Sequence, residues 1–283
     1  SDVITELKGH LEKKQNRIFG IGMAVAGLIN RERNIVEFSP DFHWRNVDVI
    51  GEMSARHDIP IIFDNVTRVM ALGELWYGIG RKIENFICIN VGYGIGAGII
   101  IQGRPLYGPK GMAGEFGHFT IDKESGIQCN CGNFGCLEAL SSGNAIAKAA
   151  QNQLKPDNKT ILKQMSKGDL SRIDAKMVVD AAKQGDAYAW NIFNQAAEYL
   201  GVGIAGLVNL FSPEAVVIGG GVAQAGDILF DKLRKVVNAR ALNKIAGEVL
   251  IEPVTFGTKS AVMGALSLIL REILNLNFKN HNY

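Results

Sequence analysis

The stretch "GHFTIDKESGIQCNCGNFGC" (117–136) brings three of the chain's four cysteines close to a histidine. His118, Cys129, Cys131 and Cys136 follow the spacing H-x10-C-x-C-x4-C. Three thiolates and one imidazole form a complete tetrahedral set of zinc ligands, with no open position for a catalytic water. The stretch therefore predicts a structural zinc site rather than a redox centre.

The residues around these ligands suit a loop that wraps tightly around an ion. Gly126, Gly132 and Gly135 lie between or beside the ligands, where glycine permits sharp turns. The alternative is a set of unrelated free thiols, but free cysteines favour apolar burial over a polar loop rich in Gly and Asn. Cys88, within "FICINV", fits that second description and is expected to be an ordinary core residue.

Composition narrows the class of protein. The chain has 283 residues, 47% of them hydrophobic, which is enough for one or two domains with a large core. With 30 Lys and Arg against 28 Asp and Glu, the net charge of +2 argues against a nucleic-acid-binding surface within these residues. No uninterrupted apolar run reaches the roughly 18 residues of a membrane span. The N-terminus "SDVITELKGHLEKK" has no apolar signal region, and so few cysteines do not indicate a disulfide-stapled secreted fold. We therefore expect a cytoplasmic protein.

Hydrophobic patterning indicates strands that alternate with helices. We expect strands within 18–29, 59–65, 214–222 and 248–256, and a glycine-rich hairpin over 84–106. We expect helices over 46–58, 68–80, 143–154, 175–210, 227–240 and 259–274. The polar stretch 155–174 reads as an inserted arm. This order predicts an α/β architecture of two lobes with a cleft between them.

Several motifs resemble one known family. The zinc segment with its flanks, "GEFGHFTID…CNCGNFGCLEALSSG", resembles the ROK family of sugar kinases and sugar-responsive repressors. The segments "ALGELWYGIG" (71–80), "GYGIGAGIIIQGRPLYG" (92–108) and "LVNLFSPEAVVIGGGV" (207–222) are also similar to that family's pattern. The likeness covers essentially the whole chain in order, and the zinc segment is its most specific part.

The resemblance implies the actin-like ATPase (ribonuclease H-like) fold, in which two α/β lobes face each other across a sugar cleft. We expect an N-terminal lobe over 1–110 and a C-terminal lobe over 111–283 that carries the zinc loop and an oligomerisation surface. The family's Asp-x-Gly-Gly-Thr phosphate loop is not found in these residues, so the N-terminal lobe is expected to lack its first strands. The winged helix-turn-helix of the family's repressors is not found either.

The resemblance also identifies where a kinase would hold its base. In kinases of the family, the segment before "ALGE" resembles E-N-D-A-N-A-A-A-L-G-E, and its aspartate deprotonates the sugar hydroxyl. Alignment on Ala71–Glu74 places Val66 at that aspartate, and valine cannot accept a proton. Asp64 is two positions earlier, about 7 Å away along an extended strand, so it could replace the base only if the strand shifted.

The hairpin departs from the kinase pattern as well. Kinases resemble Gly-Thr-Gly-x-Gly there, where the threonine and backbone amides approach ATP phosphates. Tyr93 takes the place of the threonine, and its ring is expected to crowd the phosphate site. Gly219, Gly220 and Gly221 could contact adenine or simply permit close packing of helix and strand. Phosphoryl transfer needs positioning, a base and phosphate neutralisation together, so two departures count against it.

The sugar contacts of the family are better matched. By resemblance, Asn65, Glu115, His118 and Glu138 correspond to sugar ligands, and Asp41 falls where an asparagine is usual. Carboxylates and amides that converge on ring hydroxyls discriminate one sugar from another. His118 would serve twice, with one ring nitrogen on zinc and the other toward the sugar. For Glu115 and Glu138, the alternative is a solvated face or a hydrogen bond to the zinc loop.

These observations favour the effector-binding region of a sugar-responsive transcriptional regulator, which binds a sugar without phosphorylating it. Its expected partners are a sugar or sugar derivative, operator DNA through an N-terminal helix-turn-helix outside these residues, and a second copy in a homodimer or homotetramer. Two alternatives stay open: an ATP-dependent hexose kinase of the same family whose base has moved, and a sugar sensor that binds a partner protein instead of DNA.

Overall fold

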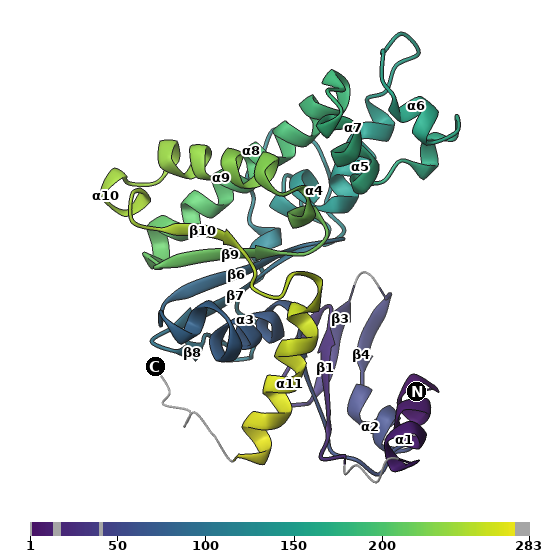
Figure 1. Ribbon diagram of the computed structural model, residues 1–283, viewed down its shortest axis with the longest axis vertical. Helices are drawn as coiled ribbons and strands as arrows, with labels where there is room; N and C mark the ends of the chain where they lie inside the picture. Colours follow the sequence, from purple (N-terminus) through teal and green to yellow (C-terminus); the bar gives the residue numbers. More distant parts are fainter. Residues whose placement is uncertain (1, 14–17, 40–41, 275–283) are drawn as a thin grey trace.

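The computed structural model describes residues 2–13, 18–39 and 42–274, which form two lobes (Figure 1). The helices are α1 (Asp2–Lys13), α2 (Val49–Ser54), α3 (Val66–Tyr77), α4 (Leu137–Ser141), α5 (Gly143–Asn152), α6 (Leu162–Met165), α7 (Ala175–Lys183), α8 (Ala187–Phe211), α9 (Asp227–Arg240), α10 (Asn243–Ala246) and α11 (Ser260–Ile273). The strands are β1 (Ile21–Val25), β2 (Leu28–Asn30), β3 (Ile35–Ser39), β4 (Trp44–Val47), β5 (Ile61–Asn65), β6 (Phe86–Val91), β7 (Ile95–Ile101), β8 (Arg104–Pro105), β9 (Ala215–Gly219) and β10 (Leu250–Pro253).

The first lobe contains two small sheets. Strands β1 and β5 pair in parallel, and β2, β3 and β4 form an antiparallel sheet. Val25, Val36 and Phe63 bring both sheets into one apolar cluster. Gly27 links β1 to β2 at φ +132°, and a Cβ there would lie 2.7 Å from the carbonyl oxygen of Phe38. The turn therefore requires glycine.

The second lobe is built on a five-stranded sheet in the order β10-β9-β6-β7-β8. Its central strand β6 is parallel to β9 and antiparallel to β7. Ile87 and Ile89 belong to the large core that includes α8 and α9, whereas Phe86 and Cys88 pack with Met70 of α3 on the opposite face. A strand covered on both faces reads as a continuous apolar run, which explains "FICINV" and confirms Cys88 as a core residue.

Two segments cross between the lobes and pack against each other. Helix α3 leaves β5 and covers one face of the large sheet, and α11 returns the chain to lie along α3 (Figure 1). Gly73 and Gly264 allow the two helices to approach closely: a Cβ on Gly73 would meet the backbone nitrogen of Gly264 at 2.8 Å. Glu74 in α3 is fully buried, and its carboxylate accepts hydrogen bonds from the backbone N–H and the hydroxyl of Thr255, both at 2.7 Å. The two crossings are thus tied together.

The expected α/β two-lobe architecture is observed, and three local predictions need correction. The helix expected over 175–210 is two helices, because Gly185 adopts a φ of +86° between α7 and α8. The stretch 155–174, expected as an inserted arm, contributes Leu162 and Ile173 to the main core. Strands β3 and β4 were not expected. In addition, the predicted boundary at residue 110 divides the large sheet, since β6, β7 and β8 precede it while β9 and β10 follow it.

Candidate functional site

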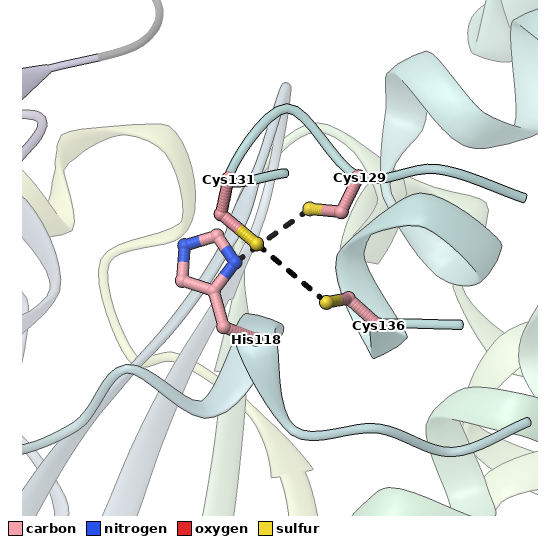
Figure 2. Close-up of side chains that lie close together, drawn as sticks. All are labelled: His118, Cys129, Cys131 and Cys136. Atoms are coloured by element: carbon pink, nitrogen blue, oxygen red, sulfur yellow. Dashed lines mark hydrogen bonds between the residues drawn. The ribbon is translucent and has the colours of Figure 1, made fainter. Parts of the chain in front are cut away.

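The four predicted metal ligands converge on one point. Their ligand atoms all lie within 4.8 Å of one another, and Figure 2 shows the side chains directed toward a common centre. The Sγ atoms of Cys131 and Cys136 are 3.7 Å apart, and Cys129 Sγ is 3.6 Å from His118 Nδ1. A tetrahedral zinc ion with ligands at about 2.0–2.3 Å would separate such atoms by roughly 3.6–3.8 Å. The donor set and its spacing therefore fit zinc.

Local backbone structure explains how the loop presents these ligands. Isolated β-bridges join Thr120 to Cys136 and Gln128 to Phe134, which folds the loop back on itself. Gly135 has a φ of +68° and lies against the backbone of Asp122, leaving no room for a side chain. Burial raises the pKa of the Cys129 thiol to about 12. A bound cation is what would hold these thiols as thiolates at neutral pH.

His118 faces two neighbours at once. Its Nδ1 points toward the cysteines, and its Nε2 lies 4.0 Å from Oε2 of Glu115. A metal on Nδ1 leaves the proton on Nε2, so the ring would present an N–H donor on the side of Glu115. The geometry thus matches the dual role predicted for His118 on the metal side; its contact with a sugar remains a prediction.

The two predicted sugar carboxylates both lie close to the metal cluster. Burial raises the pKa of Glu115 above its ordinary value, while the nearby His118 and Arg68 oppose that shift. Glu138 follows the last cysteine on α4; its Oε2 accepts a 2.9 Å hydrogen bond from the N–H of Ile95 at the start of β7. Its Oε1 lies 3.8 Å from Cys129 Sγ. Glu138 thus connects the metal loop to the glycine hairpin, as the alternative reading anticipated.

Asn65 stands at the junction of β5 and α3, where it caps the helix. Its Oδ1 accepts hydrogen bonds from the backbone N–H groups of Thr67 at 2.9 Å and Arg68 at 3.4 Å, and its Nδ2 donates to the carbonyl of Gly27 at 2.9 Å. One amide hydrogen is left for a ligand. Asp41, the remaining predicted sugar contact, lies outside the described residues.

The position that aligns with the kinase base is the start of helix α3, next to an ion pair. Val66 is the first residue of α3 and packs against the cluster under the large sheet. Asp64, the nearest carboxylate along the chain, is only 2% exposed, and its Oδ1 accepts hydrogen bonds from Arg68 Nε at 2.9 Å and Nη2 at 2.7 Å. The backbone N–H of Asn65 also donates to this oxygen, at 2.7 Å. Asp64 is therefore held in a buried ion pair with Arg68.

The two glycine-rich loops, the β6–β7 hairpin and the loop after β9, differ in how much space surrounds their residues. Tyr93 lies at the tip of the β6–β7 hairpin with 78% of its side chain exposed. Gly220 has a φ of +91°, and a Cβ there would lie within 2.6 Å of the side-chain oxygen of Asn90, so packing alone demands glycine. A side chain at Gly221 would meet nothing within 4 Å. Of this glycine run, only Gly221 faces open space.

With this geometry in view, the relationship to known proteins is clear. A sequence model of the ROK family matches residues 1–272. The chain belongs to the ROK family. Its cluster of one histidine and three cysteines is typical of the structural zinc site of ROK proteins, and its fold is the actin-like α/β fold of that family.

Named relatives of this ROK protein fall into two functional groups. A glucokinase of Halalkalibacterium halodurans is 35% identical over 94% of this chain and 80% of its own length. A xylose repressor of Caldicellulosiruptor bescii is 33% identical over 91% of this chain but only 64% of its own length. A ROK glucokinase from Streptomyces griseus, solved with glucose and AMPPNP, superposes with a TM-score of 0.83 at 29% identity over 94% of this chain and 87% of that one. Similarity alone shows no preference for the repressor branch.

One residue of the site escaped the sequence reasoning. Arg68 forms an ion pair with Asp64 and donates a hydrogen bond from Nη1 to the carbonyl of Ala113 at 3.3 Å. Its positive charge also acts to lower the pKa of Glu115. Its spacing of four residues from Asp64 was a usable signal, but the predicted helix began only at residue 68. In the structure α3 begins at Val66, so the Asp64–Arg68 pair links the end of strand β5 to the first turn of α3.

Proposed function

We propose that this ROK protein is the effector-binding region of a transcriptional regulator of carbohydrate genes, and that it binds a sugar without phosphorylating it. The observation that carries the proposal is the state of the β5–α3 junction. Val66 stands where the kinase pattern has its base, and the adjacent carboxylate of Asp64 is buried against Arg68. General base catalysis requires an accessible proton acceptor within hydrogen-bonding reach of the substrate hydroxyl.

The pocket residues support binding of a sugar. Glu115, His118 and Glu138 are grouped beside the metal cluster, and Asn65 retains one amide hydrogen at the start of α3. Groups that accept and donate in fixed directions suit a ligand with several hydroxyls. A sugar held between the lobes would favour one lobe arrangement over another, which is how binding would be transmitted. Operator DNA would be read by an N-terminal helix-turn-helix outside these residues, in a homodimer or homotetramer.

A hexose kinase is the second candidate, and the similarity to glucokinases favours it. The S. griseus relative was solved with both glucose and a nucleotide analogue. In that case a carboxylate at a position other than 66 would have to act as base, and Tyr93 would have to leave space for phosphates. The sequence encoded ahead of Ser1 separates the two: a helix-turn-helix supports the regulator, and an Asp-x-Gly-Gly-Thr strand supports the kinase.

Calorimetric titration tests the proposal directly. The protein is titrated with D-glucose, D-xylose and other sugars, and separately with Mg-ATP, and ADP formation is followed in the presence of each sugar. Sugar heat without nucleotide heat or turnover is expected. Glu115→Gln should weaken sugar binding, while Glu248→Gln, a matched change at an exposed position, should leave it intact. Sugar-dependent ADP formation above the no-enzyme rate contradicts the proposal.

A further inference from the structure

Arg68 is a buried cation at the meeting point of three site-bearing segments. Its side chain is 3% exposed, although guanidinium groups are seldom so deeply buried. From the first turn of α3, it binds Asp64 at the end of β5 through Nε and Nη2. Its remaining nitrogen, Nη1, donates to the carbonyl of Ala113. One planar group thus joins the start of α3 to a segment 45 residues further along the chain.

The segment that receives this bond carries two predicted sugar ligands. Ala113 lies two residues before Glu115 and five before His118. The same segment is also braced at Tyr107, whose ring lies under the guanidinium carbon of Arg31 at 3.8 Å and 5.9 Å from that of Arg68. Arg271 of α11 donates to the Tyr107 hydroxyl at 3.0 Å. Arg68 therefore fixes the segment 107–113, which leads directly to Glu115 and His118.

We propose that Arg68 is a positioning residue of the sugar pocket: paired with Asp64, it fixes Glu115 and His118 relative to the N-terminus of α3. That the ligand is a sugar rests on the function proposed above, whereas the role of Arg68 in fixing Glu115 and His118 does not depend on it. A buried ion pair contributes little net stability compared with packed apolar side chains of similar size. The role of the Asp64–Arg68 pair lies instead in the geometry it imposes, since a guanidinium can hold a carboxylate and a carbonyl at once in fixed directions.

The first test needs no sugar. Lysine at position 68 keeps a cation for Asp64 but lacks the fork that also reaches Ala113. We expect zinc content to be unchanged in R68K and the melting temperature to remain within a few degrees of the native protein. Hydrogen exchange of the 113–118 amides should accelerate about tenfold, while α8 keeps its native rates. Native exchange rates at 113–118 in R68K would overturn the proposal.

The second test separates positioning from stability. D64N leaves Arg68 buried without a counter-ion, so it should lower the melting temperature, and the double variant D64N/R68M should largely restore it. Glucose and xylose affinity of the double variant should stay about tenfold below native, the value of one charge-assisted hydrogen bond. K176M, which removes an exposed pair with Asp180, serves as the control and should change neither quantity.

The outcomes are distinct for the two proposals. A double variant that recovers both stability and native sugar affinity overturns the positioning role. Absence of heat with every sugar in the native protein counts against sugar binding but leaves the exchange measurement to decide on Arg68. A double variant that fails to fold leaves R68K as the deciding variant, because that substitution retains the buried charge pair.

Discussion

The metal loop and the β5–α3 junction both carry residues of the proposed sugar site, yet they have kept different parts of the family pattern. In the loop, the one histidine and three cysteines converge, and Glu138 lies two residues after the last of them. At the junction, Val66 aligns with the base of the kinase pattern, and Asp64 is paired with Arg68. Under the proposed function, sugar contacts come from the metal loop and from Asn65, whereas the kinase base belongs to the junction alone, so proton transfer can be lost while recognition is kept.

Loss of the metal should reduce stability more than any other change considered for these two regions. Cys131→Ser leaves three ligands, and we expect unfolding free energy to fall by about 4 kcal/mol or more, because structural zinc binding is coupled to folding. Melting temperature and zinc stoichiometry measure this. Sugar affinity should fall as well, since Glu138 is attached to the loop.

Cys88→Ala is the control for that variant, because it removes a thiol from the core without touching the metal loop. Zinc stoichiometry in it should be native. Full sugar affinity after complete zinc removal would contradict the dual role of His118.

Breaking the junction should come next in size. Asp64→Asn leaves the Arg68 guanidinium buried without its counter-ion, which typically costs about 3 kcal/mol. Urea unfolding monitored by circular dichroism measures the loss. Zinc content should be unchanged, since the pair and the metal ligands are on different segments. Loss of zinc from this variant would show that the two regions are not separable.

A change remote from both regions sharpens the comparison. Asp186 caps α8 through Ala189 and accepts a 2.7 Å bond from the N–H of Ile161. Burial would raise its pKa, but these backbone bonds outweigh burial and leave the pKa below its ordinary value. Its contribution is therefore present at neutral pH and lost as pH falls below about 4. Asp186→Ala should cost about 1–2 kcal/mol at pH 7.

The same measurement at low pH checks the sign. As pH falls through the lowered pKa of Asp186, the difference between Asp186→Ala and the native protein should shrink, because the native carboxyl becomes protonated. Sugar affinity at pH 7 should be native in this variant. A difference that grows on acidification would contradict the direction of the pKa shift.

Restoring a carboxylate at the junction should have the smallest effect. Val66→Asp restores an acid in the first turn of α3, at the position that aligns with the kinase base. We expect no sugar-dependent ADP formation above background, because Tyr93 still occupies the hairpin position of the kinase threonine. A coupled assay measures this. Turnover in this single variant would mean that the junction alone decides between binding and catalysis.

The metal site could be predicted from sequence because its donors are close along the chain and their residue types restrict the ion. The α/β order followed from apolar runs such as "FICINV". The break between α7 and α8 was missed because Gly185 was read as part of a continuous apolar periodicity. Strands β3 and β4 were missed because Arg31–Asn34 and the polar edge strand obscure the alternation. The Asp64–Arg68 pair depended on where α3 begins, which is the least certain part of a sequence-based prediction.

The bonds between Glu74 and Thr255 have a mechanical consequence. They join helix α3 to the segment between β10 and α11, so the two connections between the lobes are held together at this point. Two neighbouring connections that are hydrogen-bonded to each other resist sliding of one lobe past the other, but they permit rotation about the axis that runs through both. Any movement of one lobe relative to the other would therefore be a swing about that axis, with the largest displacement at the parts of each lobe farthest from it.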